Sequence, residues 1–565
     1  MALSTLAASA LAGVFSHIVY FKQGEHHLYG LFYLKLLLTA IPAATLLLSR
    51  TQSTPWTTAL PLVLKLLSSY LAGIYTSTLL YRLLFHPLNK FPGPLPARLS
   101  SLWTPTQLTN NNMHTTLLNW HKRYGPIVRI GASDLSIAHP DALEIVYGTH
   151  TRCTKGPMYD VSYPATALQL LRDPEAHHLR RRVWSGAFSD RLLRGYELRI
   201  RKYRRKLLER IEEMAEKGEA VDVTKWFNLY SFDVMGDLSF GQGFESLERG
   251  EDHWAMRLLT ASADAVGLNL PAWAFILIAA IPGIMGDFWK CLDFCGERLL
   301  ERSKNDPVIP DVSSSLLAPL KGRDVTNLTP DEKNMLYGDA RLIVIAGSDT
   351  TAATLSTIFY ELVRHPEHIT KLRAELEPIY AENDNPSKTE FLHSKIAHLE
   401  HLNGVINEAL RLHPVVPSSL QRKTPPEGIF VDGVHIPGNM HVWCPLYTIA
   451  RSELAYAQPH EFIPERWSTK PELIRHKGAF APFSLGPSPS PSPSPFPPSP
   501  LLYTPYSSNT HFHSNNNTAP RPLQLHRPPP GANEPARNPR ATDHGVRRGF
   551  CAGRRRKQVP GACEG

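Results

Sequence analysis

The chain has 565 residues, enough for roughly two to four domains, and 42% hydrophobic with 9% aromatic content excludes wholesale disorder. Six cysteines are too few for a secreted disulfide scaffold. The net charge of +9 is uneven, because residues 487–565 hold ten Lys or Arg, three Asp or Glu and 17 of the 49 prolines. That stretch alone carries +7, so the preceding 486 residues are nearly neutral, and we expect no nucleic-acid partner.

Three apolar blocks form the N-terminal end of the chain. Residues 3–21 contain no Asp, Glu, Lys or Arg, and residues 28–49 and 60–81 contain one lysine each. A helix of about 20 apolar residues spans the hydrocarbon core of a bilayer. One such block could be a buried core helix, but three in succession favour membrane spans. We therefore expect residues 1–85 to be a membrane anchor with up to three transmembrane helices.

The segment after the third block is basic and rich in proline. Arg82, Lys90 and Arg98 follow the block, and the positive-inside rule then places the downstream domain in the cytosol. Prolines at 87, 92 and 94 disfavour the α conformation of the residues before them. We expect a stiff, non-helical connector over residues 86–94.

Residues 86–486 read as one soluble domain of mixed type in which helix predominates. Two hairpins are predicted, one pairing residues 127–130 with 135–138 and one pairing 429–431 with 434–436 around Asp432-Gly433. Helical periodicity predicts helices over residues 191–215, 289–302, 335–363, 366–380 and 402–412.

The first chemical motif lies inside the long predicted helix 335–363. It reads Ala-Gly-Ser-Asp-Thr-Thr over residues 346–351, and the helix opens with a capping sequence at residues 329–332. A glycine inside a helix costs about 1 kcal/mol of helix stability relative to alanine, so the presence of Gly347 requires a structural explanation. It either packs closely against another helix, or it widens a groove in which Asp349 and Thr350 hydrogen-bond to water beside a ligand.

Three further motifs are weak when taken singly. Glu408 and Arg411 are spaced i, i+3, which is also the pattern of an ordinary surface pair. Residues 464–467 read Pro-Glu-Arg-Trp, which alone indicates only a polar turn. His177 and Arg181 share a helix face in a very basic stretch. This face is either exposed to solvent or binds an anionic ligand such as a carboxylate.

The order of these motifs resembles the cytochrome P450 family of haem-thiolate monooxygenases. A-G-x-D-T-T is followed about 60 residues later by E-x-x-R, about 55 further by P-E-R-W, and then by Phe-Ser-Leu-Gly at 483–486. The resemblance covers some 400 residues and is closest to membrane-bound fungal members that oxidise secondary metabolites. It implies the family fold, mainly α with small β-sheets, behind the N-terminal transmembrane helices.

The resemblance also implies a cofactor, partners and residue roles. The cofactor is haem b, with electrons from NADPH through an NADPH-cytochrome reductase, and the substrate is an apolar small molecule at a membrane, the endoplasmic reticulum. Residues 415–420 would line the substrate pocket. The implied residues are Asp349 and Thr350 for oxygen and its protons, Glu408, Arg411 and Arg466 for a buried ion network, and His177, Arg181 and Arg422 for the haem propionates.

The chain departs from the family at the haem loop, which should read F-x-x-G-x-x-x-C-x-G. Phe483 and Gly486 are present, but Ser490 occupies the cysteine position and Ser492 that of the second glycine. A serine hydroxyl stays protonated near pH 7, whereas a thiolate donates the electron density that drives O–O cleavage. We therefore assign no metal ligand and expect the chain as written to be inactive. Cys551 lies in a C-x-G match that we interpret as chance.

Residues 487–565 are Pro/Ser-rich and then basic, a composition that predicts a disordered tail. This tail is about as long as the segment that the family has after the haem loop. We therefore interpret it as the family's coding sequence translated in the wrong reading frame. A monooxygenase with a faulty C-terminal sequence and a catalytically dead relative therefore both remain open. The third alternative is a membrane protein that binds a partner through its basic tail.

Overall fold

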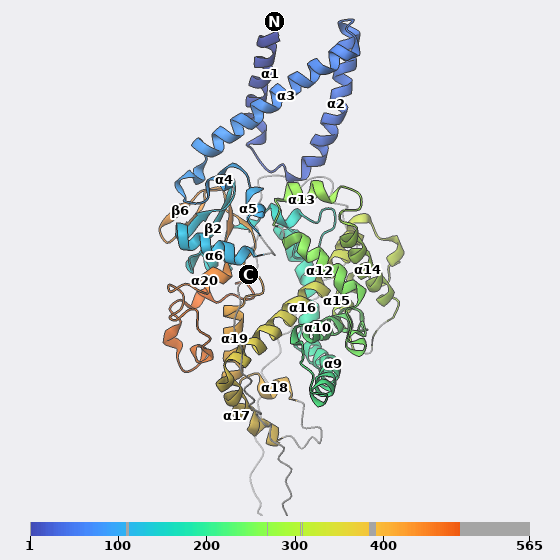
Figure 1. Ribbon diagram of the computed structural model, residues 1–565. Coiled ribbons are helices and arrows are strands. Elements are labelled where there is room, and N and C mark those ends of the chain that lie inside the picture. The colour runs from blue at the N-terminus through green and yellow to red at the C-terminus, as the bar shows by residue number, and fades with distance from the viewer. Residues whose placement is uncertain are drawn as a thin grey trace, which may run out of the picture. The chain divides into compact units, whose positions relative to one another are not determined.

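Figure 1 shows a computed structural model of the chain, which describes residues 2–108, 112–267, 269–305, 307, 309–382 and 391–485. The chain divides into two units, Met1–Ser494 and Pro495–Gly565. The predicted disorder over residues 487–565 lies outside the described residues. The described part is mainly helical with two small sheets, which confirms the predicted fold class.

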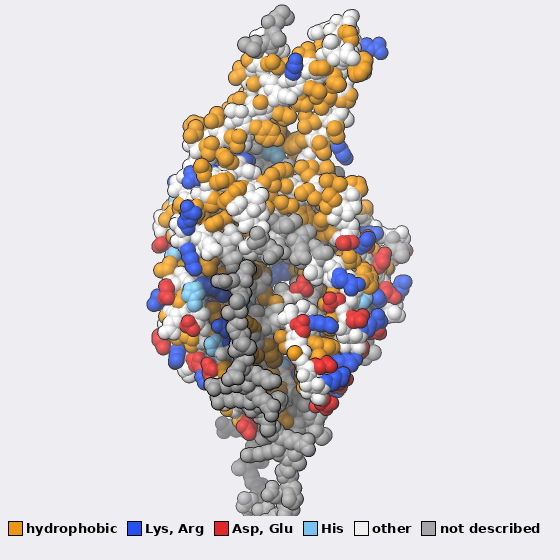
Figure 2. All heavy atoms as spheres, viewed as in Figure 1, with side chains coloured by type: hydrophobic (Ala, Val, Ile, Leu, Met, Phe, Trp, Pro, Cys, Tyr) orange, Lys and Arg blue, Asp and Glu red, His pale blue; other side chains and the backbone are white. Residues whose placement is uncertain are grey.

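Three long helices at the N-terminal end coincide with the three apolar blocks. They are α1 (Ala2–Ser16), α2 (Gly30–Thr51) and α3 (Trp56–Leu80), and π turns extend α1 and α3 over His17–Phe21 and Tyr81–Phe85. All three are long and apolar enough to cross a membrane. Figure 2 shows their hydrophobic side chains on the surface, and the exposed fractions of Phe15 and Leu47 are 66% and 65%. Exposed apolar surfaces of this kind fit helices that lie in a bilayer.

A fourth apolar helix, α16 (Pro330–Arg364), meets the same length and hydropathy criteria but belongs to the interior of the domain. It packs along α10 (Val223–Phe240) and α14 (Gly286–Arg302) and buries polar side chains such as Asp339. Its start is the predicted capping box: the Thr329 hydroxyl accepts a hydrogen bond from the Glu332 amide, and the Glu332 carboxylate accepts one from the Thr329 amide.

The connector differs in part from the prediction. Residues 87–90 form a 3₁₀ helix, Pro87–Lys90, because a proline in the first turn already has helical φ and needs no amide donor. Residues 91–94 are non-helical, as expected, and the chain then enters α4.

The other helices build the body of the domain. Their bounds are α4 Leu95–Leu99, α5 Trp103–Thr106, α6 Met113–Tyr124, α7 Asp141–Tyr147, α8 Pro174–Ser185, α9 Asp190–Glu216, α11 Ser246–Arg249, α12 Trp254–Gly267, α13 Ala272–Ala279, α15 Val312–Leu317, α17 Pro366–Glu382, α18 His393–Ile396, α19 Glu400–Leu412 and α20 Leu446–Ile449. Each of the five predicted helices appears among the observed ones.

A five-stranded sheet has the order β1-β2-β7-β4-β3, in which only β2 and β7 run parallel. A separate hairpin pairs β5 with β6, and Asp432 and Gly433 both take positive φ in its turn, as the sequence predicted. The strands are β1 Ile127–Arg129, β2 Asp134–Ile137, β3 Thr154–Lys155, β4 Arg422–Lys423, β5 Ile429–Val431, β6 Val434–Ile436 and β7 His441–Trp443.

Separate apolar cores hold the sheet and the helices. Leu135, Ile137 and Val442 are fully buried where the large sheet packs on α7. A second core lies between α9, α10 and α16, where Leu229 and Ile343 are buried. The long helix α16 is thereby held rigidly, and its motif has a defined orientation.

Candidate active site

The residues of the Ala-Gly-Ser-Asp-Thr-Thr motif on α16 have different surroundings. Gly347 faces α10, where an added Cβ would overlap the side chain of Met235, so this glycine serves close helix packing. On the same side the Ser231 hydroxyl donates a hydrogen bond to the carbonyl oxygen of Ser348 at 2.8 Å. The groove-widening interpretation of Gly347 is therefore not needed, because the helices meet at this residue.

Asp349 lines a cavity of about 520 Å³ between α10, α12 and α16, to which α10 contributes Asn228 and Phe232. The residue is exposed to this space, and the partial burial of its carboxyl group raises the pKa of Asp349 above the ordinary aspartate value. Lys225 and Arg257 also line the cavity. The Thr350 hydroxyl donates to the Ala346 carbonyl oxygen at 2.7 Å, one turn back along α16. Asp349 thus lies beside an open space in which its carboxyl group can accept and release protons, whereas Thr350, the next residue of α16, does not line this cavity.

A cluster of cationic side chains gathers at the edge of the large sheet. Lys155 of β3 lies opposite Arg422 of β4 in the strand register, and like charges in that position repel. Burial together with Arg422 lowers the pKa of Lys155 to about 7. Burial, assisted by Lys155, Arg181 and Arg422, lowers the pKa of His177 on α8 to about 4. An anionic ligand would relieve this repulsion.

Glu408 is the centre of a buried ion network. Its carboxylate accepts two hydrogen bonds from Arg411, at 2.9 and 2.7 Å, and one from the Arg466 Nε at 3.3 Å. The Ile463 amide and the Trp467 indole N–H also donate to it, at 3.0 and 2.9 Å. All three charged side chains are fully buried. The ordinary surface-pair interpretation of Glu408 and Arg411 is therefore wrong.

Backbone carbonyl groups complete this network. Arg411 Nη1 donates to the carbonyl oxygens of Ala450 and Pro459, both at 2.7 Å. Arg466 Nη1 donates to those of Ala457 and Leu473, at 2.7 and 3.0 Å. The two guanidinium groups thus hold the irregular segment after α20 onto α19, because their charges are paired and their donors used.

The predicted site residues fall into three groups on separate elements. Asp349 and Thr350 lie on α16, the cations lie on α8 and the sheet edge, and the Glu408 network lies on α19 and the 3₁₀ helix Pro464–Trp467. Lys155 and Trp467 were not identified as site residues from the sequence. Lys155 stands in a short loop-like stretch without a motif, so only the strand register reveals its place.

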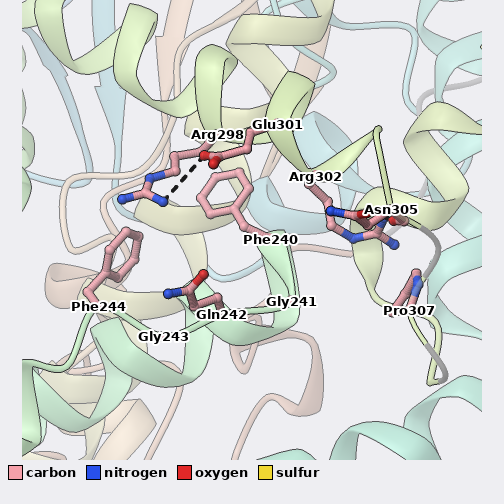
Figure 3. Close-up of a pocket in the computed structure, with 10 residues that line it drawn as sticks. All are labelled: Phe240, Gly241, Gln242, Gly243, Phe244, Arg298, Glu301, Arg302, Asn305 and Pro307. Carbon is pink, nitrogen blue, oxygen red and sulfur yellow. Dashed lines mark hydrogen bonds and ion pairs between the residues drawn. The ribbon is translucent and has the colours of Figure 1, made fainter.

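A second cavity, of about 270 Å³, lies between the loop after α10 and the C-terminal end of α14. Figure 3 shows its lining, in which Arg298 and Glu301 face each other and Arg302 lies beside Asn305. The lining includes none of the predicted site residues, and we assign it no role in the reaction.

The cation cluster fits the two propionate carboxylates of a haem. The residue expected to bind the haem iron does not fit, because the sequence has Ser490 where the family motif has a cysteine. Ser490 lies outside the described residues. The described cysteines, Cys153, Cys291, Cys295 and Cys444, are all buried and unpaired. Burial raises the pKa of the Cys153 and Cys444 thiols, which keeps them protonated and poor as iron ligands.

Comparisons with known proteins show the family of the chain. The cytochrome P450 family model matches residues 90–488. The tryprostatin B 6-hydroxylase of Neosartorya fischeri is 45% identical over 486 residues, which cover 85% of this chain and 87% of that protein. The cytochrome P450 monooxygenase notG′ of Aspergillus versicolor is 46% identical over 477 residues, 84% of this chain and 86% of that protein. The chain therefore belongs to the cytochrome P450 family, which makes it by family a monooxygenase whose cofactor is haem iron.

Proposed function

We propose that the protein oxidises an apolar small molecule taken from the membrane, in the secondary metabolism of a fungus, and receives electrons from NADPH through a reductase. We place it in the endoplasmic reticulum with its domain in the cytosol. The observation that supports a membrane-borne substrate is the apolar surface around α13. Trp273 and Ile278 are 42% and 38% exposed, and Ile281 and Ile284 are more than half exposed.

This surface adjoins the membrane anchor. Helix α13 packs against α2, and a Cβ on Gly30 would lie 3.3 Å from the Leu277 side chain. Figure 2 shows hydrophobic side chains running from the anchor helices onto the adjoining part of the domain, while charged side chains gather at the opposite end. A domain that rests on the bilayer through α13 would meet apolar molecules at that face.

The residue groups then have distinct tasks. Lys155, His177, Arg181 and Arg422 would hold the propionates, and the Glu408 network would stabilise the segment after α20. Asp349, aided by its raised pKa, would accept and deliver protons at the cavity edge, and Thr350 would act with it on oxygen and its protons. The bound haem supplies oxygen activation, while this chain positions the cofactor and moves the protons.

We propose that the sequence as written has three parts with different roles. Residues 1–85 are the anchor, 86–486 the catalytic domain, and 487–565 a tail that does not provide the thiolate. The support for inactivity is Ser490, because an alcohol is a hard, weak ligand for iron. A dead relative and a partner-binding tail remain alternatives that no contact of the described residues favours.

The deciding experiment is the carbon monoxide difference spectrum of the reduced protein. The full chain as written should show no thiolate-type Soret band. A chain whose residues 487–565 are replaced by an in-frame haem loop and C-terminal segment of the family should show it, because the Glu408 network and the cation cluster are intact. The matched control carries the same replacement with serine kept at the cysteine position, and should lack the band.

Each other result has a definite meaning. A thiolate spectrum from the unmodified chain would refute the proposed inactivity, and Cys551→Ser would then test that cysteine as the ligand. Absence of the band from the repaired chain would show that the domain itself has lost haem binding, as a dead relative would.

The repaired chain also tests the proton-handling residues. Thr350→Ala should leave the carbon monoxide spectrum unchanged but lower product formed per NADPH by about 100-fold, with hydrogen peroxide released instead. Thr351→Ala is the matched control, because this neighbouring threonine lies on another side of α16. Equal coupling in both variants would contradict the assigned role of Thr350.

A further inference from the structure

Three metal-ligating side chains converge at a place that the reaction does not use. His368 lies in the first turn of α17, His401 in the first turn of α19, and Glu465 in the 3₁₀ helix Pro464–Trp467. Figure 1 shows α17 and α19 side by side, and they pack against each other. The sequence gives no metal-binding spacing here, because the three residues come from segments far apart in the chain.

The separations of the ligand atoms are close to those of a tetrahedral site. His368 Nδ1 lies 3.2 Å from His401 Nε2 and 3.9 Å from Glu465 Oε1, and all three atoms lie within 4.8 Å of one another. Zinc with bonds of about 2.0–2.1 Å places tetrahedral ligand atoms about 3.4 Å apart. Small side-chain movements would therefore suffice to bring all three onto one ion.

The protonation states also suit a cation. Burial lowers the pKa of His368 and of His401, so both imidazoles are neutral at pH 7 and can offer a lone pair. The pKa of Glu465 is lowered as well, although burial opposes it, because its carboxylate accepts a hydrogen bond from Lys371. Two neutral imidazoles and one carboxylate are a ligand set found in zinc sites that keep one position open.

Neighbouring contacts hold the ligands in place. His368 is only 4% exposed, and its ring packs edge-on against Phe462 with the ring centres 5.6 Å apart. The Glu375 carboxylate of α17 accepts hydrogen bonds from the amides of His401 and Leu402, at 2.8 and 2.9 Å, which fixes the start of α19. Such outer contacts orient metal ligands before the ion arrives.

Lys371 is the competitor for Glu465. Its ammonium group forms an ion pair with Glu465 Oε1, the oxygen nearest to His368. The Lys371 side chain is half exposed, so it can move into solvent when a cation replaces it. The ion pair between Lys371 and Glu465 does not by itself account for the two histidines beside the carboxylate.

We propose that His368, His401 and Glu465 bind a divalent transition-metal ion, with Zn²⁺ the best fit and water as the fourth ligand. The ion ties α17 and α19 to the segment that carries Arg466. It therefore clamps the outer side of the Glu408 network and is separate from the haem.

The test is zinc titration of the full-length, detergent-solubilised chain after removal of metal by chelator dialysis. Competition with a chromophoric chelator gives affinity and stoichiometry. His401→Ala and Glu465→Gln should each remove one equivalent of Zn²⁺ or weaken its binding at least about 100-fold, more than loss of an outer-shell partner costs. His398→Ala is the matched control, an exposed histidine just before α19, and should bind like the unmodified chain.

Two further measurements separate a metal site from a structural cluster. Zn²⁺ should raise the unfolding temperature of the unmodified chain and of His398→Ala, but not of His401→Ala, and Mg²⁺ should raise none of them. Lys371→Ala should tighten Zn²⁺ binding by about tenfold, since it removes a cation that competes for the same carboxylate oxygen of Glu465. Unfolding curves without metal show whether His401→Ala is folded, and His401→Gln replaces it if it is not.

The proposal is overturned by either of two results. One is equal stoichiometry and affinity in the unmodified chain and in folded His401 variants, which would assign the bound zinc to other histidines or cysteines. The other is an unchanged affinity in the Glu465→Gln variant, because Glu465 would then not be a ligand.

Discussion

Glu408→Ala should destabilise the domain more than other single carboxylate replacements, because five donors converge on this side chain. Two come from Arg411 and one each from Arg466, Ile463 and Trp467. Removing the carboxylate leaves two buried guanidinium charges without their counter-charge. It also leaves an amide and an indole N–H without acceptors.

The size of the effect follows from those losses. Breaking a buried ion pair by removing one partner costs about 3–5 kcal/mol, and each unsatisfied neutral donor costs about 1–3 kcal/mol. Contributions within one network are not additive, so we expect a loss of at least about 4 kcal/mol. A domain with a net stability of about 5–15 kcal/mol would lose much of it.

Urea unfolding of the detergent-solubilised chain, followed by tryptophan fluorescence, measures this loss. Glu408→Gln keeps the volume and removes the charge, so its loss reports the electrostatic part. Glu461→Ala is the matched control: it removes an exposed carboxylate but keeps the carbonyl that accepts from Arg411 at 2.9 Å. A loss below about 1 kcal/mol for Glu408→Ala, typical of a surface pair, would refute the argument.

The remaining predictions concern α16, pH and the anchor. Gly338→Ala should cost about 1–3 kcal/mol of unfolding free energy, because its Cβ would meet the rigid backbone carbonyl of Thr166. Gly347→Ala should cost less, because its Cβ would meet the side chain of Met235, which can move; equal losses would contradict this. Burial lowers the pKa of His121 to about 4, so the unfolded chain, whose histidines have pKa values of about 6.5, binds more protons between these values. His121 therefore contributes up to about 3 kcal/mol to the free energy of unfolding above pH 6.5, and this contribution is lost as the pH falls toward 4. In urea-unfolding data, His121→Gln should make the free energy of unfolding depend less on pH in this range. The full chain should stay in the membrane pellet after alkaline carbonate extraction, because its three N-terminal helices are long and apolar enough to cross a membrane, and its recovery in the supernatant would refute the anchor.

Much of the fold could be predicted because its signals are local. The capping box at Thr329 and Glu332 is closed by atoms three residues apart, and the turn at Asp432-Gly433 needs only positive φ at two residues. The three apolar blocks likewise need no partner to form the three long apolar helices observed. Caps and tight turns are stabilised by residues that are neighbours in the chain, so they can be predicted from the sequence alone.

Tertiary structure decided which charges are buried and which residues meet. Glu408 and Arg411 have the spacing of a surface pair, and only the segment from Ile463 to Trp467 folding over them makes the pair a buried network. Lys155 joins the cation cluster through strand register with Arg422, and His368 meets His401 through the packing of α17 on α19. The sequence by itself determined the helices, hairpins and the family. Burial and convergence depend on segments distant in the chain, because desolvation and Coulomb energies are set by whatever packs around a group rather than by its neighbours in sequence.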